Sequence, residues 1–417
     1  MRKHNATIPA PYGADASYAA ESVLPQPFPR TMGPNCSAYI QEVIESGLSS
    51  DMIGRFEAAF ADELGVNHCI ATPGCTPALA ILAAASCFAP GDEIIVSPIT
   101  DYGTVQGLLA QNYIPVFPDV LPGTVNVGAE TIAPCITDRT RAILVVHFTG
   151  IVCDMDPILE LAQKHGLVVY EDTCQATFSD YKGRMAGTLG TAAGFSFDSE
   201  KTLGSDVGGC VVTDSDELAE RLRFIGQSRG GEVRPPFGRV HTVLGYAHRM
   251  TQSTAAITLA QLEIIRPQVT QRDAMIRLLS ELMAEIPGII PLSIPNYQQT
   301  YSCWMAGFNI NPDAFVCDAD TFAAQLAQSG ISGIGTGRYY LMPAGLEFLQ
   351  KQADQQHFPF SPETATYRYR YRAEDCPTAH AFLDTFIRWS TFCEKYQPEH
   401  CFQVASMIRK VAERNYR

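Results

Sequence analysis

The sequence contains few charged residues and no excess of basic ones. Charged residues make up 18% of the 417 positions, and the formal net charge is −14. Nonspecific binding to nucleic acids or to anionic membranes needs a basic surface, so this composition argues against both classes of partner. Any phosphate group on a ligand must therefore be bound by local hydrogen-bond donors, because the overall field of the protein repels it.

Long apolar runs and an apolar leader are also missing. The first residues, Met1–Asn5, lead into a polar stretch rich in proline and alanine, and an apolar stretch such as Ala78–Ala89 ends at Pro90. A transmembrane helix needs about 20 consecutive apolar residues, and a secretory signal needs an apolar core. We therefore expect a cytoplasmic protein that is not attached to a membrane.

The 13 cysteines show no spacing typical of a metal site or of a disulfide framework. No CxxC pair occurs, and the intervals between the cysteines are irregular. We predict no metal site, and we expect reduced thiols that are buried as small apolar side chains.

Short β-branched runs alternate with helical patterns from about residue 68 onward. The expected strands are His68–Ala71, Glu93–Ser97, Pro115–Asp119, Ala142–His147, Leu167–Glu171, Ala193–Phe197 and Gly209–Thr213. Helical patterns lie between most of them, at Thr76–Cys87, Thr104–Gln111, Pro157–Lys164 and Glu217–Phe224. This alternation predicts an α/β fold with a mainly parallel sheet covered by helices on both faces. Ligands of such sheets bind just outside the carboxyl ends of the strands.

The patterns divide the chain into three expected parts. Residues 1–39 form an N-terminal arm, residues 40–268 a large domain that carries the sheet, and residues 269–417 a smaller α+β domain. A helix near the second boundary is expected to break at Pro267, because proline interrupts helices. The alternating Tyr367–Arg372 stretch favours an exposed edge strand protected by arginines, with contact to a sugar phosphate as the alternative.

Three segments near the middle of the chain have the residue types and the order of a pyridoxal phosphate site. They are Glu171–Ala176, Phe195–Lys201 and Gly208–Gly209. An acid at the end of an apolar strand, a hydroxyl group and a nearby lysine match the pyridine nitrogen, the phosphate and the aldehyde of this cofactor.

Lys201 and Asp172 are the candidate catalytic residues. Lys201 has no other basic residue beside it and would form the imine with the aldehyde of the cofactor, although an isolated lysine is usually a solvated surface residue. Asp172 follows an apolar strand and would keep the pyridine nitrogen protonated by charge pairing. An N-cap of a following helix is an equally good interpretation of Asp172 taken alone.

The strand–turn–helix junction at Pro73–Leu79 is the candidate phosphate site. The Thr76 hydroxyl and the N–H groups of the first helical turn, including that of Cys75, would face an anion at the positive end of the helix. Ser196 would add another hydroxyl. A simple turn and cap is the alternative for this junction.

Further candidates would surround the cofactor ring. Gln175 could hydrogen-bond the phenolic oxygen, with a surface amide as the alternative. Tyr102 would stack on the ring, with core packing as the alternative. His147 follows a strand and could line the same edge, although structural hydrogen bonds explain a histidine there equally well.

Taken in order, these segments resemble the DegT/DnrJ/EryC1/StrS family of sugar aminotransferases, which are fold-type I pyridoxal phosphate enzymes. The resemblance runs from about residue 40 to about residue 265 and continues more faintly to the C-terminus. The segments that carry it include Cys75–Leu79, where the family has GT(A/S)AL, followed by Val116–Val120, Glu171–Ala176, FSF-x3-Lys201, Gly208–Gly209 and Gly245–Met250. The presence of Lys201 places the chain with the transaminases, because a dehydratase branch carries histidine at that position.

This resemblance implies roles for the candidate residues. Lys201 would be the Schiff-base lysine, Asp172 would pair with the pyridine nitrogen, and Gln175 would contact the ring oxygen. The residues implied for the phosphate and the ring face are Cys75, Thr76, Ser196 and Tyr102. The implied reaction moves an amino group from glutamate or glutamine to a ketone of a sugar or cyclitol that carries a phosphate or a nucleotide. Family members are homodimers with shared active sites, so a homodimer is implied as well.

The expected substrate contacts are charged or aromatic residues, several of them in loops that the family uses near its active site. They are His147, Arg234, Arg239, His241, Arg249, Arg338, Tyr339 and Tyr340.

Three departures from the family pattern indicate a divergent member. Cys75 replaces a glycine, and Asp206–Gly209 replaces a GEGG turn. Ala247 replaces the asparagine that reaches the partner's phosphate, so that His248 or Arg249 substitutes for it or the contact is lost. Two alternatives to transamination therefore stay open: another pyridoxal phosphate reaction, such as decarboxylation, elimination or Cβ chemistry, and a non-catalytic sensor of the cofactor or of a sugar.

Overall fold

The structure is a computed structural model, which describes residues 24–227, 232–236, 238–240, 243–337 and 339–417. A seven-stranded sheet forms the centre of the larger part of the molecule, with the order β1-β10-β9-β6-β5-β2-β4. The strands are β1 (His68–Thr72), β2 (Glu93–Val96), β4 (Ile114–Val116), β5 (Thr140–Val146), β6 (Val168–Asp172), β9 (Ala192–Ser196) and β10 (Gly209–Thr213). From β9 to β4 all neighbours are parallel, and β10 runs antiparallel to both β1 and β9. All seven predicted strands and the mainly parallel sheet are confirmed, with small shifts at the strand ends.

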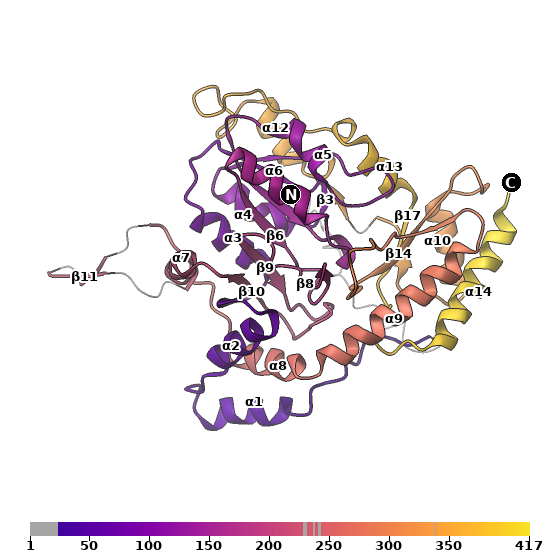
Figure 1. Ribbon diagram of the computed structural model, residues 1–417, viewed down its shortest axis with the longest axis horizontal. Coiled ribbons are helices and arrows are strands. Elements are labelled where there is room, and N and C mark those ends of the chain that lie inside the picture. Colours follow the sequence, from indigo (N-terminus) through magenta and orange to yellow (C-terminus); the bar gives the residue numbers. More distant parts are fainter. Residues whose placement is uncertain (1–23, 228–231, 237, 241–242, 338) are drawn as a thin grey trace, which may run out of the picture.

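Helices cover both faces of this sheet, as Figure 1 shows. Strands β9 and β10 are buried at every position, because each face of the sheet meets a helix layer. One core holds apolar residues of α3 (Cys75–Ala85), α4 (Tyr102–Ala110) and α7 (Asp216–Gln227). Two further cores hold those of α2 (Met52–Leu64) and α8 (Gln252–Leu262), and of α6 (Met155–His165). Gly107 allows α4 to approach α3 closely, since a Cβ there would lie 2.5 Å from the Cα atom of Ala80.

The helical break that the sequence placed at Pro267 lies earlier. Helix α8 ends at Leu262, and the next helix, α9, spans Ile265–Ala284. Pro267 belongs to the first turn of α9, where the backbone N–H groups have no intrahelical acceptor and proline is tolerated. Helix α9 therefore runs across the expected domain boundary at residues 268 and 269.

A smaller antiparallel sheet follows α9 and has the order β13-β14-β17-β15. Its strands are β13 (Ile289–Pro291), β14 (Ala306–Ile310), β15 (Ile334–Gly335) and β17 (Phe386–Trp389). The sheet shares a hydrophobic core with α9 and with the helices α10 (Ala319–Gln328) and α14 (Pro398–Asn415). This arrangement is the smaller α+β unit that the sequence predicted. Within the described ranges, none of the helices combines the length and the apolar character that crossing a membrane requires.

Residues 340–371 pack on the central sheet, although the sequence assigned them to the C-terminal domain. Strand β16 (Tyr340–Leu341) pairs with β3 (Ile99–Thr100). Beyond β16, Leu349 and Phe360 share the core of α3 and α4. Helix α12 (Glu347–Asp354) carries Leu349. The C-terminal part of the chain therefore contributes to the core of the larger part.

The Tyr367–Arg372 stretch is not the edge strand that the sequence favoured. It forms no backbone ladder and is held instead by tyrosine hydroxyl groups. The Tyr371 hydroxyl donates a hydrogen bond to the carbonyl of Pro115, at 2.8 Å, and the Tyr367 hydroxyl donates to Asp138, also at 2.8 Å. Because Pro115 lies in the edge strand β4, this stretch covers an edge of the central sheet.

The remaining elements are short, apart from α1 and α13. They are α1 (Cys36–Glu45), α5 (Ala129–Ile132), β7 (Asp180–Tyr181), β8 (Arg184–Met185), β11 (Glu232–Arg234), β12 (Gly238–Val240), α11 (Met342–Gly345) and α13 (Pro377–Thr385).

Candidate active site

A pocket of about 350 Å³ lies where the carboxyl ends of β6 and β9 approach the N-terminal ends of α3 and α4. Its lining combines acidic, aromatic and thiol groups around one lysine: Asp101, Cys174, Gln175, Asp198, Ser199, Glu200, Lys201, Trp304, Tyr339 and Tyr340. Lys201, Gln175, Tyr339 and Tyr340 are sequence-predicted site residues that the fold brings together here.

Asp172 ends β6 and is buried beside the pocket. Its Oδ2 atom accepts a hydrogen bond from the Thr104 hydroxyl at 2.7 Å, and its Oδ1 atom accepts one from the backbone N–H of Cys174 at 3.1 Å. No helix begins between this residue and α7, so the N-cap interpretation of Asp172 is wrong. Two hydrogen-bond donors instead fix the carboxylate beside the pocket. This position suits pairing with a protonated ring nitrogen.

His147 and Glu171 form a fully buried pair behind Asp172. The Nε2 atom of His147 lies 2.9 Å from Glu171, and its Nδ1 atom accepts the backbone N–H of Cys153 at 3.2 Å. Because Nδ1 accepts a hydrogen bond, Nε2 carries the proton of the ring and donates a hydrogen bond to Glu171. Both ring nitrogens of His147 therefore form hydrogen bonds inside the core. This is the structural role that the sequence left open as the alternative, and His147 does not contact a substrate.

Glu171 also accepts backbone N–H groups from the turn at residues 187–190. Burial alone would raise the pKa of Glu171, but the hydrogen bond from His147, together with these N–H groups, outweighs it and lowers the pKa. The carboxylate therefore stays ionised and ties β6 to the chain that leads into β9.

Lys201 lies in the turn that follows β9 and extends across an aromatic face. Its Nζ atom is 3.5 Å from the centroid of the Trp304 ring. The indole N–H of Trp304 donates a hydrogen bond to the carbonyl of Glu200 at 2.9 Å. Trp304 thus contacts both the amino group of the lysine and the backbone that carries it.

Arg30 holds the same turn from the other side. Its guanidinium group donates hydrogen bonds to the carbonyls of Ser199 and Lys201, both at 2.7 Å, and of Thr202 at 2.8 Å. A guanidinium group suits this contact because its donors have a fixed, forked geometry. The lysine turn, residues 198–202, is therefore fixed by residues that lie far from it in the sequence on both sides.

The first turn of α3 provides free backbone donors. Its N-cap, Gly74, has no side chain that could accept their hydrogen bonds. Strand β10 packs tightly against this helix start, because a Cβ atom on Gly209 would lie 2.4 Å from the carbonyl carbon of Gly74. Ser196 is the cross-strand partner of Gly209, so its hydroxyl belongs to the same region. An uncapped helix start beside a lysine and a buried carboxylate fits a pyridoxal phosphate group.

Gln175 and Tyr102 occupy defined positions next to the pocket. Gln175 is buried, and its side-chain oxygen accepts the backbone N–H of Thr149 at 2.6 Å, so it is not a surface amide. Tyr102 begins α4 and meets Phe348 edge-on, with ring centroids 6.2 Å apart. The residue before it, Asp101, lines the pocket.

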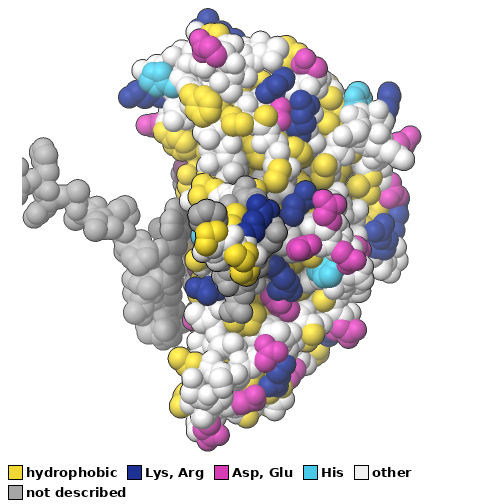
Figure 2. Space-filling view, turned by 90° about the vertical axis from the view of Figure 1, so that its left-hand side faces the viewer, with side chains coloured by type: hydrophobic (Ala, Val, Ile, Leu, Met, Phe, Trp, Pro, Cys, Tyr) yellow, Lys and Arg dark blue, Asp and Glu magenta, His cyan; other side chains and the backbone are white. Residues whose placement is uncertain are grey.

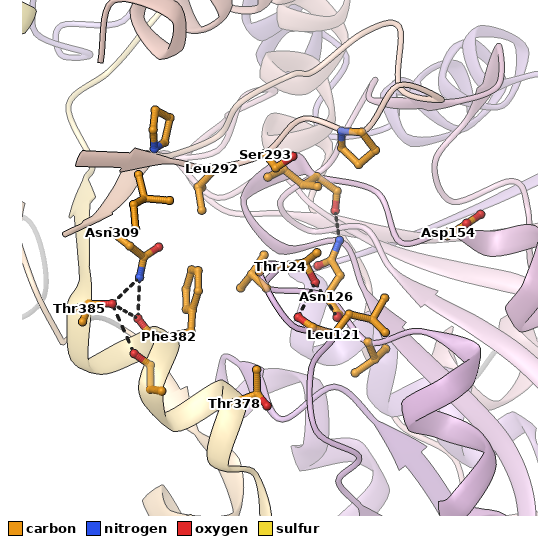
Figure 3. Close-up of a pocket in the computed structure, with 18 of the residues that line it drawn as sticks. Leu121, Thr124, Asn126, Asp154, Leu292, Ser293, Asn309, Thr378, Phe382 and Thr385 are labelled. Atoms are coloured by element: carbon orange, nitrogen blue, oxygen red, sulfur yellow. Dashed lines mark hydrogen bonds between the residues drawn. The ribbon is translucent and has the colours of Figure 1, made fainter. Parts of the chain in front are cut away.

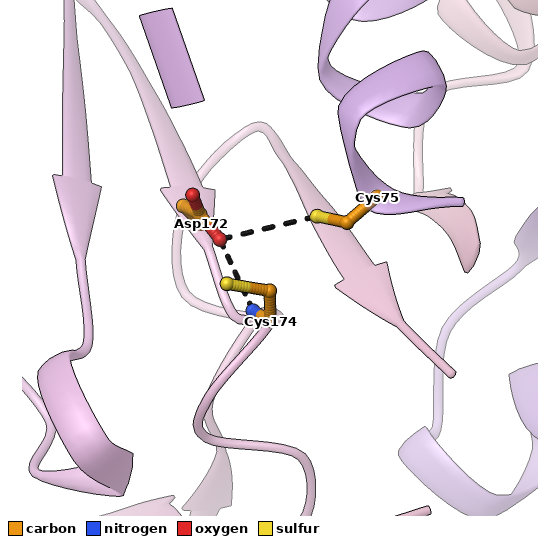
Figure 4. Close-up of side chains that lie close together, drawn as sticks. All are labelled: Cys75, Asp172 and Cys174. Carbon is orange, nitrogen blue, oxygen red and sulfur yellow. Dashed lines mark hydrogen bonds between the residues drawn. The ribbon is translucent and has the colours of Figure 1, made fainter. Parts of the chain in front are cut away.

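Two thiols lie next to the carboxylate of Asp172 (Figure 4). The Sγ atom of Cys75 is 4.0 Å from Oδ1 of Asp172, and the thiol of Cys174 is close to both groups. The hydrogen bond with Cys174, burial and the charge of Asp172 together raise the pKa of Cys75 well above its usual value. Of the thirteen cysteines, all of which lie in the described ranges, only Cys87 is exposed.

Of the other predicted substrate residues, those that the structure describes do not line this pocket within one chain. Arg249 lines a separate pocket of about 430 Å³ together with Glu57 and Arg223. Arg234 and Arg239 belong to the two strands of the β11–β12 hairpin, which projects from the body of the molecule (Figure 1). His241 and Arg338 lie outside the described residues.

Sequence reasoning missed Trp304, Thr104 and Arg30. Trp304 is one of only two tryptophans in the chain, and this rarity was the one available signal. Thr104 lies inside a helix pattern and Arg30 in the expected arm, so nothing in the local sequence pointed to a contact with Asp172 or with the lysine turn.

A larger cavity, of about 550 Å³, lies between the segment 121–127, β13 and α13 (Figure 3). The amide of Asn126 donates to the carbonyl of Ile151, and that of Asn309 donates to the carbonyl of Phe382 and to Thr385, each at 2.8 Å. Its lining contains no lysine, and its only carboxylate, Asp154, accepts a hydrogen bond from the Tyr181 hydroxyl at 2.6 Å. This cavity therefore has no group for imine chemistry.

Comparisons with known proteins agree with this geometry. The profile of the DegT/DnrJ/EryC1/StrS aminotransferase family matches residues 31–370. The chain is 36% identical over 251 residues to the GDP-perosamine synthase of Caulobacter vibrioides, which covers 60% of this chain and 67% of that protein. It is 33% identical over 287 residues to a proposed L-glutamine:3-amino-2,3-dideoxy-scyllo-inosose aminotransferase of Micromonospora echinospora, covering 67% of this chain and 68% of that protein.

The fold also matches solved structures. The crystal structure of 3-amino-5-hydroxybenzoic acid synthase superposes with a TM-score of 0.80 at 23% identity and covers 94% of this chain and 99% of that one. This likeness establishes a common fold-type I architecture for the two chains.

Proposed function

The chain belongs to the DegT/DnrJ/EryC1/StrS aminotransferase family, and we propose that it transfers an amino group from glutamate or glutamine to a ketone of a sugar or cyclitol. Its cofactor is pyridoxal phosphate, as in the rest of the family. When bound, this cofactor supplies an electron sink that makes a proton on the amine-bearing carbon acidic. The observation that carries the proposal is the position of Lys201, which shares one pocket with Cys174 and Gln175, just after the fixed carboxylate of Asp172.

In this proposal Lys201 has two tasks. Its Nζ atom would hold the cofactor covalently. As a free amine, the same atom would take a proton from one carbon and return it to another, acting as general base and general acid. The contacts of the turn with Arg30 and Trp304 support these tasks, because proton transfer requires a defined position of Nζ.

Asp172 keeps the ring nitrogen protonated in this proposal. Thr104 and the backbone N–H of Cys174 orient its carboxylate. The first turn of α3, with Cys75 and Thr76, and the hydroxyl of Ser196 would hold the phosphate. Gln175 would face the ring oxygen, and Tyr102 would cover one face of the ring.

The acceptor would bind against the outer wall of the pocket. This wall is formed by Trp304, Tyr339 and Tyr340, whose rings offer apolar faces to the acceptor. The names of the relatives point to nucleotide-linked sugars and to cyclitols as acceptor classes. A keto-sugar or keto-cyclitol that carries a nucleotide or a phosphate is the acceptor class that we propose.

A homodimer would complete the site. The β11–β12 hairpin carries Val233, which is 71% exposed, and Leu244 just beyond it is 84% exposed. Figure 2 shows the face from which this hairpin projects, where side chains of both charges are interspersed with hydrophobic ones. In a dimer Arg234 and Arg249 would contact the pocket of the partner. We place this enzyme in the cytoplasm.

An absorption spectrum of the purified protein tests the amino-transfer reaction directly. We expect a visible imine band that disappears when glutamate or glutamine is added and returns with a keto acid. Lys201→Ala protein should fold normally, lack this band and show no turnover. A band that responds to no amino donor, or a Lys201→Ala variant with full activity, would contradict the proposal.

Product analysis with a keto-sugar separates transamination from other reactions of the same cofactor. Only transamination consumes one donor for each amine formed and leaves the aminated cofactor after the first half-reaction. Release of carbon dioxide or of an eliminated group without an aminated product would instead assign decarboxylation or elimination to the pocket.

A further inference from the structure

Two thiols and a carboxylate meet beside the pocket that Cys174 lines, in the arrangement shown in Figure 4. They belong to Cys75, Asp172 and Cys174, and one ligand atom from each lies within 4.8 Å of the others. The three residues come from the first turn of α3, the end of β6 and the turn after β6. The irregular spacing of the cysteines in the sequence hid this cluster, because only the fold brings Cys75 to the other two residues.

The donor set is that of a thiophilic divalent cation. Thiolate and carboxylate groups bind Zn²⁺ at about 2.3 Å and about 2.0–2.2 Å, so ligand atoms around one tetrahedral ion lie roughly 3.5–3.8 Å apart. The separation of 4.0 Å between Sγ of Cys75 and Oδ1 of Asp172 is close to this value. Small rotations of the two thiol groups would therefore bring all three atoms into contact with one ion.

The surroundings of the cluster also suit a metal ion. The Thr104 hydroxyl orients the carboxylate of Asp172 and in turn contacts the Thr100 hydroxyl at 2.6 Å. Such outer contacts fix a ligand before the metal arrives. Cys174 lines the open pocket, which provides an entry path and room for a water molecule as the fourth ligand.

The charges balance when the ion is bound. Two thiolates and one carboxylate carry three negative charges, and Zn²⁺ leaves one of them uncompensated. The ammonium group of Lys201 lines the same pocket as Cys174 and supplies the remaining positive charge.

We propose that the cofactor-free enzyme binds one Zn²⁺ ion through Cys75, Asp172 and Cys174, and that this ion and pyridoxal phosphate exclude each other. The exclusion rests on the proposed function, in which Asp172 pairs with the ring nitrogen and so cannot also bind a metal. The family pattern has glycine at the position of Cys75 and so lacks this thiol ligand. Zinc would thus keep newly made or cofactor-depleted enzyme inactive until the cofactor displaces it.

Cobalt provides a spectroscopic probe of the site. We would titrate the full-length, cofactor-free protein with Co²⁺ alone and record the thiolate-to-cobalt absorption in the near ultraviolet. One equivalent should bind, and added Zn²⁺ should displace it. Cys75→Ser and Cys174→Ser should each weaken binding at least about tenfold, whereas Cys87→Ser, a matched change at the exposed cysteine, should bind as the wild type does. Thermal melting of each variant verifies that it is folded.

The exclusion is measured in the same samples. Protein loaded with pyridoxal phosphate should not develop the cobalt absorption, and Zn²⁺ should slow the appearance of the imine band. Unchanged cobalt binding in Cys75→Ser and Cys174→Ser, or in the loaded protein, overturns the proposal. Cobalt binding in Lys201→Arg, which cannot form the imine but keeps the positive charge and all three ligands, separates the metal site from the aminotransferase assignment.

Discussion

The amino group of Lys201 lies over the indole ring of Trp304, with 3.5 Å between Nζ and the ring centroid. A cation in this position is stabilised by about 0.5–2 kcal/mol, depending on its access to water. Trp304 adds a hydrogen bond to the carbonyl of Glu200. This tryptophan comes from the chain just before β14, so the segment that leads into the smaller sheet contacts the lysine turn.

Trp304→Leu should lower kcat about tenfold, because it removes both the aromatic face and a hydrogen bond of about 0.5–1.5 kcal/mol from the lysine turn. Trp304→Phe keeps a ring under Nζ and should lose less. Steady-state kinetics with the amino donor measure both variants, and thermal melting serves as the control for folding. A Trp304→Leu enzyme with the kcat of the wild type would show that the contact is incidental.

Arg30→Ala should loosen the lysine turn and so impair the imine. The guanidinium group donates to three carbonyls of the lysine turn, and hydrogen bonds from charged groups contribute about 1.5–3 kcal/mol each. We expect kcat to fall at least tenfold and the pH titration of the imine band to shift, with Arg30→Lys intermediate. Arg55→Ala is the matched control, since Arg55 forms a surface ion pair with Glu42, and such pairs contribute little. Equal effects of Arg30→Ala and Arg55→Ala would refute a positioning role.

Thr104 positions Asp172 through a hydrogen bond of 2.7 Å. Thr104→Val keeps the shape of the side chain and removes the donor, so kcat should fall about tenfold through the loss of about 1.5 kcal/mol, with KM nearly unchanged. Thr104→Ser restores the hydroxyl and should recover most of the activity. If serine and valine at this position give the same kcat, the hydrogen bond does not matter to the reaction.

Glu171→Gln should change how stability depends on pH. The folded-state pKa of Glu171 is lowered below its ordinary value of 4.5, although burial opposes this, because His147 and three backbone N–H groups hold the ionised form. Its contribution to the free energy of unfolding is therefore fully present above about pH 4.5 and is lost as the pH falls through the lower folded value. Near neutral pH the variant should be less stable by about 1.5–3 kcal/mol.

Chemical denaturation of both proteins across the acid range measures this difference. The difference in the free energy of unfolding between wild type and Glu171→Gln should become smaller below pH 4.5. Glu42→Gln, at an exposed position, should leave the curve unchanged. If this difference stays constant down to the pH of acid unfolding, the charge of Glu171 contributes nothing to stability.

The sequence was sufficient to predict the central sheet and the residues at its edge. Strands such as β9 and β10 are buried on both faces and therefore read as continuous apolar runs. Parallel strands place their carboxyl ends together, so Asp172 and Lys201 could be assigned to one site from their positions after β6 and β9. Local sequence patterns carry this information, because the burial of a strand can be recognised from a few consecutive residues.

Contacts between distant segments could not be predicted in the same way. Arg30 and Trp304 reach the lysine turn from positions 171 and 103 residues away from Lys201. Pro267 was expected to break a helix, but its position in the first turn depends on where α9 begins. The tyrosines of residues 367–371 have the alternation of a strand, yet their hydroxyl groups bind across to other elements. In each case the contacts or the element boundary in the folded chain, and not the local sequence pattern, determine the structure.

The position of Trp304 has a consequence for how the protein is made. When the ribosome has produced the first 300 residues, the central strands and Lys201 are available, but the lysine turn lacks one of its two supports. Strand β14 follows Trp304 and has β17, residues Phe386–Trp389, as its neighbour on one side. Domains tend to fold from the N-terminus during synthesis. The nascent chain should therefore form its central sheet early but become able to hold the cofactor only after β17 has been made.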